Sequence, residues 1–246
     1  MKLWEGRFTQ PSAKNADIFN QSLSFDKKLY WHDIFACIAH VKMLGETNIL
    51  PKEEAEKICD TLQEILQDIE SGALAIEGAE DIHTFIEQEL VKRIGVMGKR
   101  MHTARSRNDQ VATDFRLYVK DSIRTDIALL RALIETLVKL AEDNVGSIMP
   151  GYTHMRRAQP ISTAQYLNAY SEMFLRDIER FADCFRRTDV MPLGSCALAG
   201  TDFPIDRTMT AKLMNFARIS QNSLDAVSDR DFVAEYIFAC STVMAH

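Results

Sequence analysis

The sequence has little glycine and proline and no long apolar run. Of its 246 residues only 10 are glycine and 6 are proline, and they cluster between long periodic segments, which is typical of helices joined by short turns. No stretch approaches the roughly 18 consecutive apolar residues of a membrane helix. The first residues, Met-Lys-Leu-Trp-Glu-Gly-Arg-Phe, lack the apolar core of a signal peptide. We therefore expect a cytoplasmic protein without a membrane partner.

Basic tracts and metal-binding patterns are also missing. The 29 Lys and Arg residues are outnumbered by 35 Asp and Glu residues, and the net charge of −6 is spread along the chain, so a nucleic-acid partner is not expected. The five cysteines are scattered, without a Cys-x-x-Cys pair, and we expect reduced thiols. Because no two histidines have a helical metal spacing with an acidic partner, we predict no protein-bound metal.

Apolar residues, by contrast, make up 46% of the chain and recur with helical spacing. In the first half they predict helices at about 26–45, with Asp26 as N-cap, at 51–71 and at 81–94. In the second half, spacings of 4 and 3 from Phe115 to Ala141 hold one face, so a helix over about 108–145 would be on the order of 55 Å long. The pattern returns from Ala164 to Phe185, which predicts two antiparallel long helices.

The predicted fold is all-α, with a small N-terminal helical domain at 1–107 followed by the first part of a long-helix bundle at 108–246. Shorter helices are expected near 207–217 and from Phe232 onward. The last of these helices stops at His246 without the glycine or asparagine that usually ends a helix. We therefore expect the bundle to be truncated in this sequence.

One polar segment, Met-His-Thr-Ala-Arg-Ser-Arg-Asn-Asp-Gln at 101–110, lies directly before the longest predicted helix. Ser106 or Asn108 can cap this helix, whose free N–H groups favour an anion. Arg107 has a planar guanidinium that suits a carboxylate. The segment thus predicts a cradle for a small, carboxylate-rich molecule. The alternative is that these residues only cap the helix and that the arginines pair with acidic neighbours.

Two further segments carry histidines. Thr153, His154 and Gln159 lie in the break between the two long helices, at 150–160, where a rigid turn can present a hydroxyl, an imidazole and an amide together. Because histidine titrates near neutrality, His154 suits proton transfer or the polarisation of a carboxylate. His83 falls in the first turn of the helix predicted at 81–94. Either histidine can instead be a hydrogen-bonded structural residue.

Taken together, these segments resemble those of the argininosuccinate lyases, a branch of the fumarate lyase (aspartase/fumarase) superfamily. Ser-Arg-Asn-Asp-Gln at 106–110 is the most specific of them, because fumarases, aspartases and adenylosuccinate lyases differ there. Small departures occur at Phe85 and at Met155-Arg156, where the family more often has alanine and Leu-Gln. The resemblance runs from end to end through Trp-Glu-Gly-Arg-Phe at 4–8, Phe-Asn-Gln-Ser at 19–22, Asp-Ile-His-Thr at 81–84, the run at 102–110, Gly-Tyr-Thr-His at 151–154 with Arg-Ala-Gln-Pro at 157–160, Pro-Leu-Gly-Ser at 192–195 and Ser-Asp-Arg-Asp-Phe at 228–232.

The resemblance implies the reversible cleavage of argininosuccinate to arginine and fumarate, in arginine biosynthesis or the urea cycle and without a cofactor. It also implies a homotetramer whose long helices form a common core and whose active sites each draw on three subunits. Thr153 and His154 would act at the reacting end of the substrate. The substrate-binding residues that it implies are Ser22, His83, Ser106, Arg107, Asn108 and Gln159.

The family's flexible loop, Gly-Ser-Ser-x-Met-Pro-x-Lys-x-Asn-Pro, does not occur in this sequence. In the family it supplies a serine expected to be catalytic and a substrate-binding lysine, so the resemblance implies that this chain is inactive by itself. Two other interpretations stay open. One is a fumarate lyase that acts on a different amino-succinate, and the other is a non-catalytic role, as in the lens crystallins that arose from this family.

Overall fold

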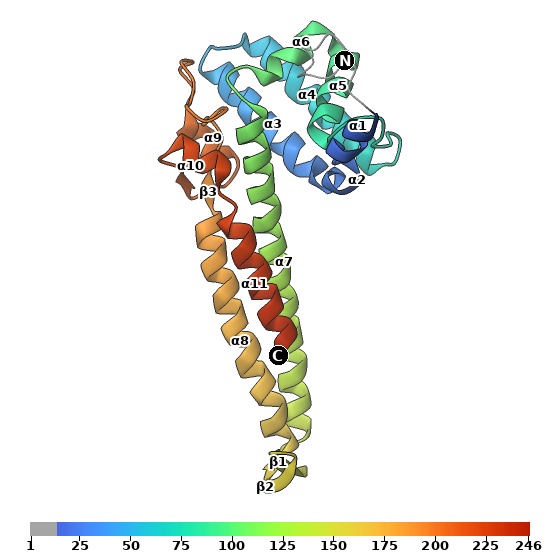
Figure 1. The fold of residues 1–246 in the computed structure, drawn as a ribbon, viewed down its shortest axis with the longest axis vertical. Helices are drawn as coiled ribbons and strands as arrows, with labels where there is room; N and C mark the ends of the chain where they lie inside the picture. Colours follow the sequence, from blue (N-terminus) through green and yellow to red (C-terminus); the bar gives the residue numbers. More distant parts are fainter. Residues whose placement is uncertain (1–13) are drawn as a thin grey trace.

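Helices form nearly all the regular structure in residues 14–246, the part of the chain that the computed structural model describes (Figure 1). They are divided between a head, which contains the first half of the chain, and a long stalk (Figure 1). The all-α class predicted from the sequence is confirmed. The segment at 4–8 that contributes to the resemblance lies outside the described residues.

The head packs around three helices, α3 (Tyr30–Glu46), α4 (Lys52–Glu70) and α5 (Ile82–Ile94). Before them come α1 (Lys14–Asn20), α2 (Leu23–Asp26) and the 3-10 helix η2 (Lys27–Leu29), and after them α6 (Val96–Lys99) and the 3-10 helix η3 (Arg100–His102). The apolar positions that the periodicity selects, such as Leu44, Ile58, Leu62 and Ile65, are fully buried, and their burial stabilises the head.

The prediction that Asp26 caps the helix after it is wrong. The helix α3 begins at Tyr30, and Asp26 makes no capping hydrogen bond with its side chain. Its carboxylate instead accepts hydrogen bonds from Ser22 Oγ at 2.5 Å and from the backbone N–H of Ile82 at 3.1 Å. Asp26 therefore links the start of the head to the start of α5, a contact between segments that local sequence cannot reveal.

The stalk consists of α7 (Arg107–Asp143), α8 (Thr163–Thr188) and α11 (Asp231–Ala245), which lie side by side (Figure 1). The helix α7 has 37 residues, which corresponds to about 55 Å, as predicted. Between α7 and α8 the chain forms an antiparallel hairpin of β1 (Ile148–Thr153) and β2 (Arg156–Ser162) at the far end of the stalk. The sequence predicted only a turn there.

Short elements join the head to the stalk: β3 (Val190–Met191) pairs in parallel with β4 (Arg218–Ile219), and α9 (Arg207–Leu213) and α10 (Ser223–Ser228) lie beside them. Two cations on α7 are buried in this joint. Lys120 Nζ donates to Asp189 Oδ1 at 2.5 Å and to the carbonyl of Asn215 at 2.7 Å. Arg116 bonds to Asp229 and to a carbonyl at the end of α8. The division into two domains at 107/108 stays a prediction.

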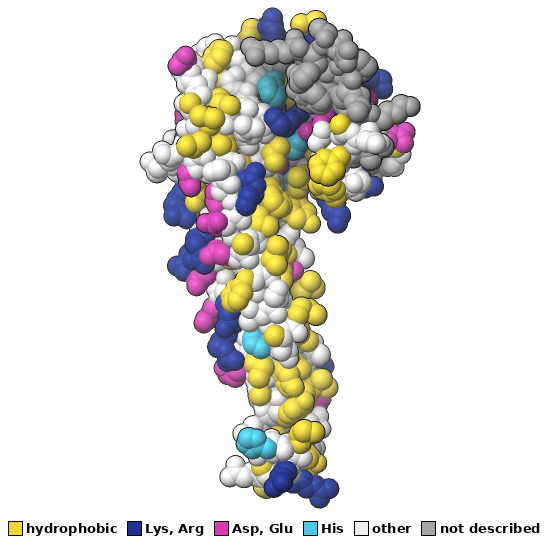
Figure 2. Space-filling view, in the orientation of Figure 1, with side chains coloured by type: hydrophobic (Ala, Val, Ile, Leu, Met, Phe, Trp, Pro, Cys, Tyr) yellow, Lys and Arg dark blue, Asp and Glu magenta, His cyan; other side chains and the backbone are white. Residues whose placement is uncertain are grey.

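One face of the stalk is apolar and exposed. Hydrophobic side chains gather along it in Figure 2. Leu129 and Met244, which line one groove between α7 and α11, are 64% and 84% exposed. Exposed apolar stripes of this kind usually mark a surface that another element or subunit covers. No helix among residues 14–246 is both long and apolar enough to cross a membrane.

Candidate functional site

Ser106 caps α7 and fixes the start of the longest helix. Its Oγ accepts from the backbone N–H of Asn108 at 3.3 Å, and Asp109 Oδ1 accepts from the N–H of Ser106 at 3.0 Å, which together form a capping box. Of the two candidates, Ser106 and not Asn108 is therefore the N-cap. The other oxygen of Asp109 accepts from the N–H groups of Gly194 and Cys196 at 2.9 and 2.8 Å. This buried carboxylate holds the loop at 194–196 against the start of α7.

Arg107 lies in the first turn of α7, where side chains from two helices orient its guanidinium. Its Nη1 donates to Oε1 of Gln110 at 3.1 Å, and its Nη2 donates to Oγ1 of Thr84 at 3.2 Å. Its Nε lies 3.7 Å from Oδ2 of Asp81, so pairing with an acidic neighbour, the alternative raised from the sequence, does occur. The side chain is still 25% exposed, and its position allows a charge-assisted bond to a carboxylate from solution.

Ser22 and Asn108 lie near the starts of the same two helices. The Asp26 carboxylate, which accepts from Ser22, also accepts from the N–H of Ile82, the residue after Asp81. Asn108 Nδ2 donates to a backbone carbonyl in the loop at 195–200 at 3.0 Å. The structure therefore gathers Ser22, Ser106, Arg107 and Asn108 around the N-termini of α5 and α7, where the positive ends of the helix dipoles favour an anion.

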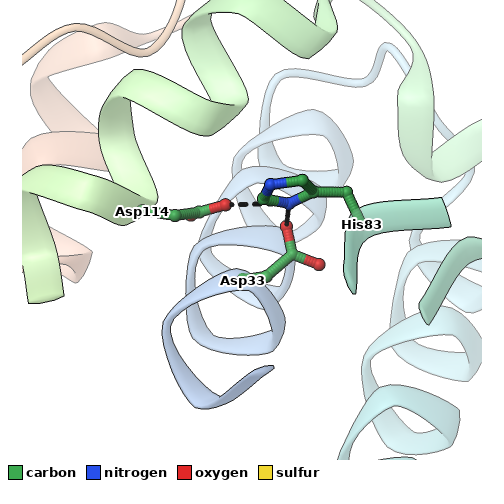
Figure 3. A group of neighbouring side chains, drawn as sticks. All are labelled: Asp33, His83 and Asp114. Atoms are coloured by element: carbon green, nitrogen blue, oxygen red, sulfur yellow. Dashed lines mark hydrogen bonds and ion pairs between the residues drawn. The ribbon is translucent and has the colours of Figure 1, made fainter. Parts of the chain in front are cut away.

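His83 lies below this surface, in a buried cluster that connects three helices (Figure 3). Its Nδ1 is 2.8 Å from Oδ1 of Asp33 on α3 and 3.3 Å from Oδ2 of Asp114 on α7. All three side chains are at most 3% exposed, and the guanidinium of Arg105 is buried nearby, bonded to Cys37. These contacts are those of a hydrogen-bonded structural residue, the alternative raised for His83 from the sequence. Its substrate-binding role stays a prediction.

Burial and charge act against each other in this cluster. Burial disfavours a charge on His83, but the carboxylate of Asp33 reverses that effect and raises the pKa of His83 to about 10. Burial also disfavours a charge on Asp33, yet His83 holds the pKa of that carboxyl well below its usual range. Burial and the charge of Asp33 raise the pKa of Asp114 to about 7. The cluster therefore contains an imidazolium paired with Asp33 at neutral pH.

The same three residues are of the types that bind metals, and their ligand atoms lie within 4.8 Å of one another. One ring nitrogen of His83 faces both carboxylates, and Gln110 Nε2 donates to Asp33 Oδ1 at 2.5 Å. A proton on that nitrogen explains the approach of two oxygens, whereas a metal would need the nitrogen as a lone-pair donor. The hydrogen bond from Gln110 and the raised pKa of His83 correspond to an ion pair between His83 and Asp33.

Thr153, His154 and Gln159 lie at the opposite end of the molecule, on the β1–β2 hairpin (Figure 1). Thr153 pairs with Arg156, so His154 and Met155 form a two-residue turn, and both have positive φ, 49° and 62°. Such φ values are costly for residues other than glycine and are often found at functional sites. All three predicted residues are exposed, and the length of α7 separates them from Arg107. Within one chain the two groups of predicted site residues do not meet.

The sequence did not single out the residues that orient Arg107. Thr84 lies on α5 and Asp81 is the N-cap of that helix, and only folding brings them to α7. Gln110 was part of the polar segment, and its i+3 spacing from Arg107 on one helix was a signal that could have paired them. Asp33 and Asp114 each sit in a helix interior, where a carboxylate on a buried face must find a partner.

Known proteins similar to this chain are lyases. A family model described as "Lyase" matches residues 6–246. The argininosuccinate lyase of Desulforamulus reducens is 55% identical over 247 aligned residues, which cover all of this chain and 54% of that protein. The chain thus spans about half the length of the curated relatives it matches.

Solved structures show the same fold. An EDDS lyase in complex with formate superposes with a TM-score of 0.81 and 30% sequence identity, over 89% of this chain and 43% of that one. An EDDS lyase variant with bound fumarate superposes with a TM-score of 0.82 and 28% identity, over 96% and 48% of the respective chains. The arrangement of head and stalk is therefore shared with these enzymes.

Proposed function

Because a family model matches it over residues 6–246, the chain belongs to the lyase family, and we propose that the full-length protein is an argininosuccinate lyase. The observation that carries this proposal is the 55% identity to an argininosuccinate lyase along the whole chain. It agrees with the Ser-Arg-Asn-Asp-Gln segment at 106–110. Cleavage of argininosuccinate to arginine and fumarate places the protein in arginine biosynthesis, in the cytoplasm.

The reaction removes a proton from the carbon next to a succinyl carboxylate and then breaks the C–N bond to the guanidinium of the departing arginine. Negative charge accumulates on the carboxylate during proton removal, so fixed donors must face it. Arg107, with Ser22, Ser106 and Asn108 beside it, holds substrate carboxylates at the starts of α5 and α7. Orientation of the Arg107 guanidinium by Gln110, Thr84 and Asp81 supports this role, since an oriented guanidinium loses little further freedom on binding.

Thr153 and His154 act at the reacting end, with Gln159 beside them as a substrate contact. Because the hairpin that carries them is separated from Arg107 by the length of α7, each active site must combine the head of one subunit with the hairpin of another. The proposed assembly is a homotetramer, in which the exposed apolar face of the stalk is buried against other subunits. The carboxyl-terminal half of the relatives would complete each site.

The proposal is tested with the full-length protein, this chain together with the carboxyl-terminal portion that its relatives have. Argininosuccinate and a panel of other succinyl adducts are supplied in turn, and fumarate release is followed by its ultraviolet absorbance. We expect argininosuccinate to give the highest kcat/KM. If a folded, tetrameric preparation released no fumarate from argininosuccinate, the proposal would be overturned.

One second candidate has a specific observation in its favour. Two structural neighbours with TM-scores above 0.8 are EDDS lyases, so a fumarate lyase that acts on a different amino-succinate has the same fold. The panel therefore includes EDDS. A kcat/KM for EDDS above that for argininosuccinate would favour this second function.

A further inference from the structure

Gln110 occupies a buried position between Arg107 and the cluster around His83. Its side-chain amide is engaged at both ends, since Oε1 accepts from Arg107 Nη1 at 3.1 Å and Nε2 donates to Asp33 Oδ1 at 2.5 Å. The residue is 1% exposed. Turning the amide over would direct its N–H groups at a guanidinium and its oxygen at a carboxylate. The two charged neighbours therefore fix the direction of the amide.

Asp33, the far end of this link, is itself held firmly. His83 binds the same Oδ1 atom at 2.8 Å, and His83 in turn lies 3.3 Å from Asp114 (Figure 3). These residues come from α3, α5 and α7, the helices that meet in the head. Because all of them are buried, their ion pair is weakly screened and strongly constrained in geometry. Gln110 is thus anchored to the rigid part of the fold.

The second hydrogen bond of the Arg107 guanidinium is also made to a residue next to the His83 cluster. Arg107 Nη2 donates to Thr84, the residue after His83 on α5. Both terminal nitrogens of the guanidinium are therefore fixed, one through Gln110 and Asp33 and the other through α5. A free arginine side chain loses rotamer entropy when it is fixed, and orienting it before the substrate arrives lowers the cost of binding.

We propose that Gln110 is a positioning residue, which orients the Arg107 guanidinium towards a substrate carboxylate and is itself anchored on the buried Asp33–His83–Asp114 cluster. This inference deepens the proposed function and rests on it, since it assigns Arg107 to carboxylate binding. A buried amide that served packing alone would be replaceable by leucine at little cost to activity. A positioning amide is not replaceable in this way, because leucine leaves Arg107 Nη1 without its acceptor.

The test compares Gln110→Leu with a matched control in the full-length protein. Thr113→Val is the control, because Thr113 is buried on the same helix and its Oγ1 donates only to the carbonyl of Asp109. We expect Gln110→Leu to lower kcat/KM by about tenfold, mainly through a higher KM. Thr113→Val should stay within about twofold of the parent protein. Melting temperatures of both variants show whether loss of stability accounts for any change.

A double-mutant cycle with Arg107→Ala separates positioning from a structural role. If Gln110 acts through Arg107, then Gln110→Leu should change kcat/KM by less than about twofold once Arg107 is alanine. The same tenfold loss with and without Arg107 would refute the inference, and so would an unchanged kcat/KM in Gln110→Leu alone. If Gln110→Leu does not fold, Gln110→Asn, which withdraws the amide by one methylene group, replaces it in the cycle.

Failure of the proposed function is visible separately, because the unsubstituted protein would then release no fumarate from argininosuccinate. In that case, the melting temperatures of the same variants test whether Gln110 and Arg107 interact. A combined shift smaller than the sum of the two single shifts supports the link, since both substitutions remove the same hydrogen bond. Strictly additive shifts would overturn it.

Discussion

Arg107 and His154 lie at opposite ends of α7, and this separation predicts that two inactive variants restore activity when they assemble together. The helix between them has 37 residues and is about 55 Å long, far beyond the reach of any side chain. If both residues serve one active site, they must come from different chains. A full-length Arg107→Ala subunit still has an intact hairpin, and a His154→Asn subunit still has an intact head.

The size of the recovery follows from the geometry. In an equal mixture that associates at random, a site receives an intact Arg107 from one subunit with probability one half. It receives an intact His154 from another subunit with the same probability, so about a quarter of the sites carry both. We expect the mixture to reach about a quarter of the parent activity, well above either variant alone.

The assay unfolds equal amounts of the two variants in denaturant, refolds them together and measures fumarate release from argininosuccinate. Variants refolded separately and then combined serve as the control for subunit exchange. A second mixture pairs the unsubstituted protein with a chain that carries both substitutions. Sites shared between subunits predict about a quarter of the parent activity in this mixture, whereas sites within one subunit predict about a half. A value of one half here, with no recovery in the first mixture, would refute the reasoning.

Four further predictions concern single properties. In the full-length protein, Arg107→Ala should raise KM and cost about 2–4 kcal/mol in kcat/KM, while His154→Asn should spare KM and lower kcat about 10²-fold or more; a normal kcat with a lower melting temperature would make His154 structural. Asp33→Asn should lower the free energy of unfolding by about 3 kcal/mol in denaturant titrations, because it removes the carboxylate that makes the shorter contact with the buried imidazolium of His83. Since the pKa of His83 is raised to about 10, its contribution to stability is complete below pH 6.5 and should decline as the pH rises towards 10, by at most about 1.4 kcal/mol per unit; a His83→Gln variant should lack this slope. The 246-residue chain alone should self-associate in light scattering through the exposed face of α7 and α11, and a monodisperse monomer would contradict this expectation.

Helical periodicity was sufficient to predict the stalk. The spacing of apolar residues from Phe115 to Ala141 placed α7 to within two residues at each end, because a long amphipathic helix repeats one signal many times. Ser106 was among the two expected caps for the same reason, since capping is a local interaction. Features that depend on neighbours in the chain were therefore mostly predictable, and the Asp26 cap failed because its carboxylate bonds to Ile82 in a distant segment.

Features that depend on distant segments, and one local turn of atypical sequence, were not predictable. The β1–β2 hairpin has His-Met in its turn, whereas sequence rules expect asparagine or glycine at positions with positive φ. The buried cluster joins Asp33, His83 and Asp114 from three helices, and no spacing in the sequence relates them. The separation of Arg107 from His154 likewise appears only when the length of α7 is seen in space.

The length of the stalk turns a small rotation at the head into a large displacement of the hairpin. A rotation of about one degree where α7 leaves the head displaces a hairpin about 55 Å away by about 1 Å, and misplacement by that amount can reduce turnover about 10²-fold. The position of the His154 imidazole therefore depends on contacts towards the other end of the molecule, where Lys120 is held by Asp189 and the carbonyl of Asn215. In the proposed assembly, those buried contacts would determine where the imidazole of one subunit arrives in the site of another.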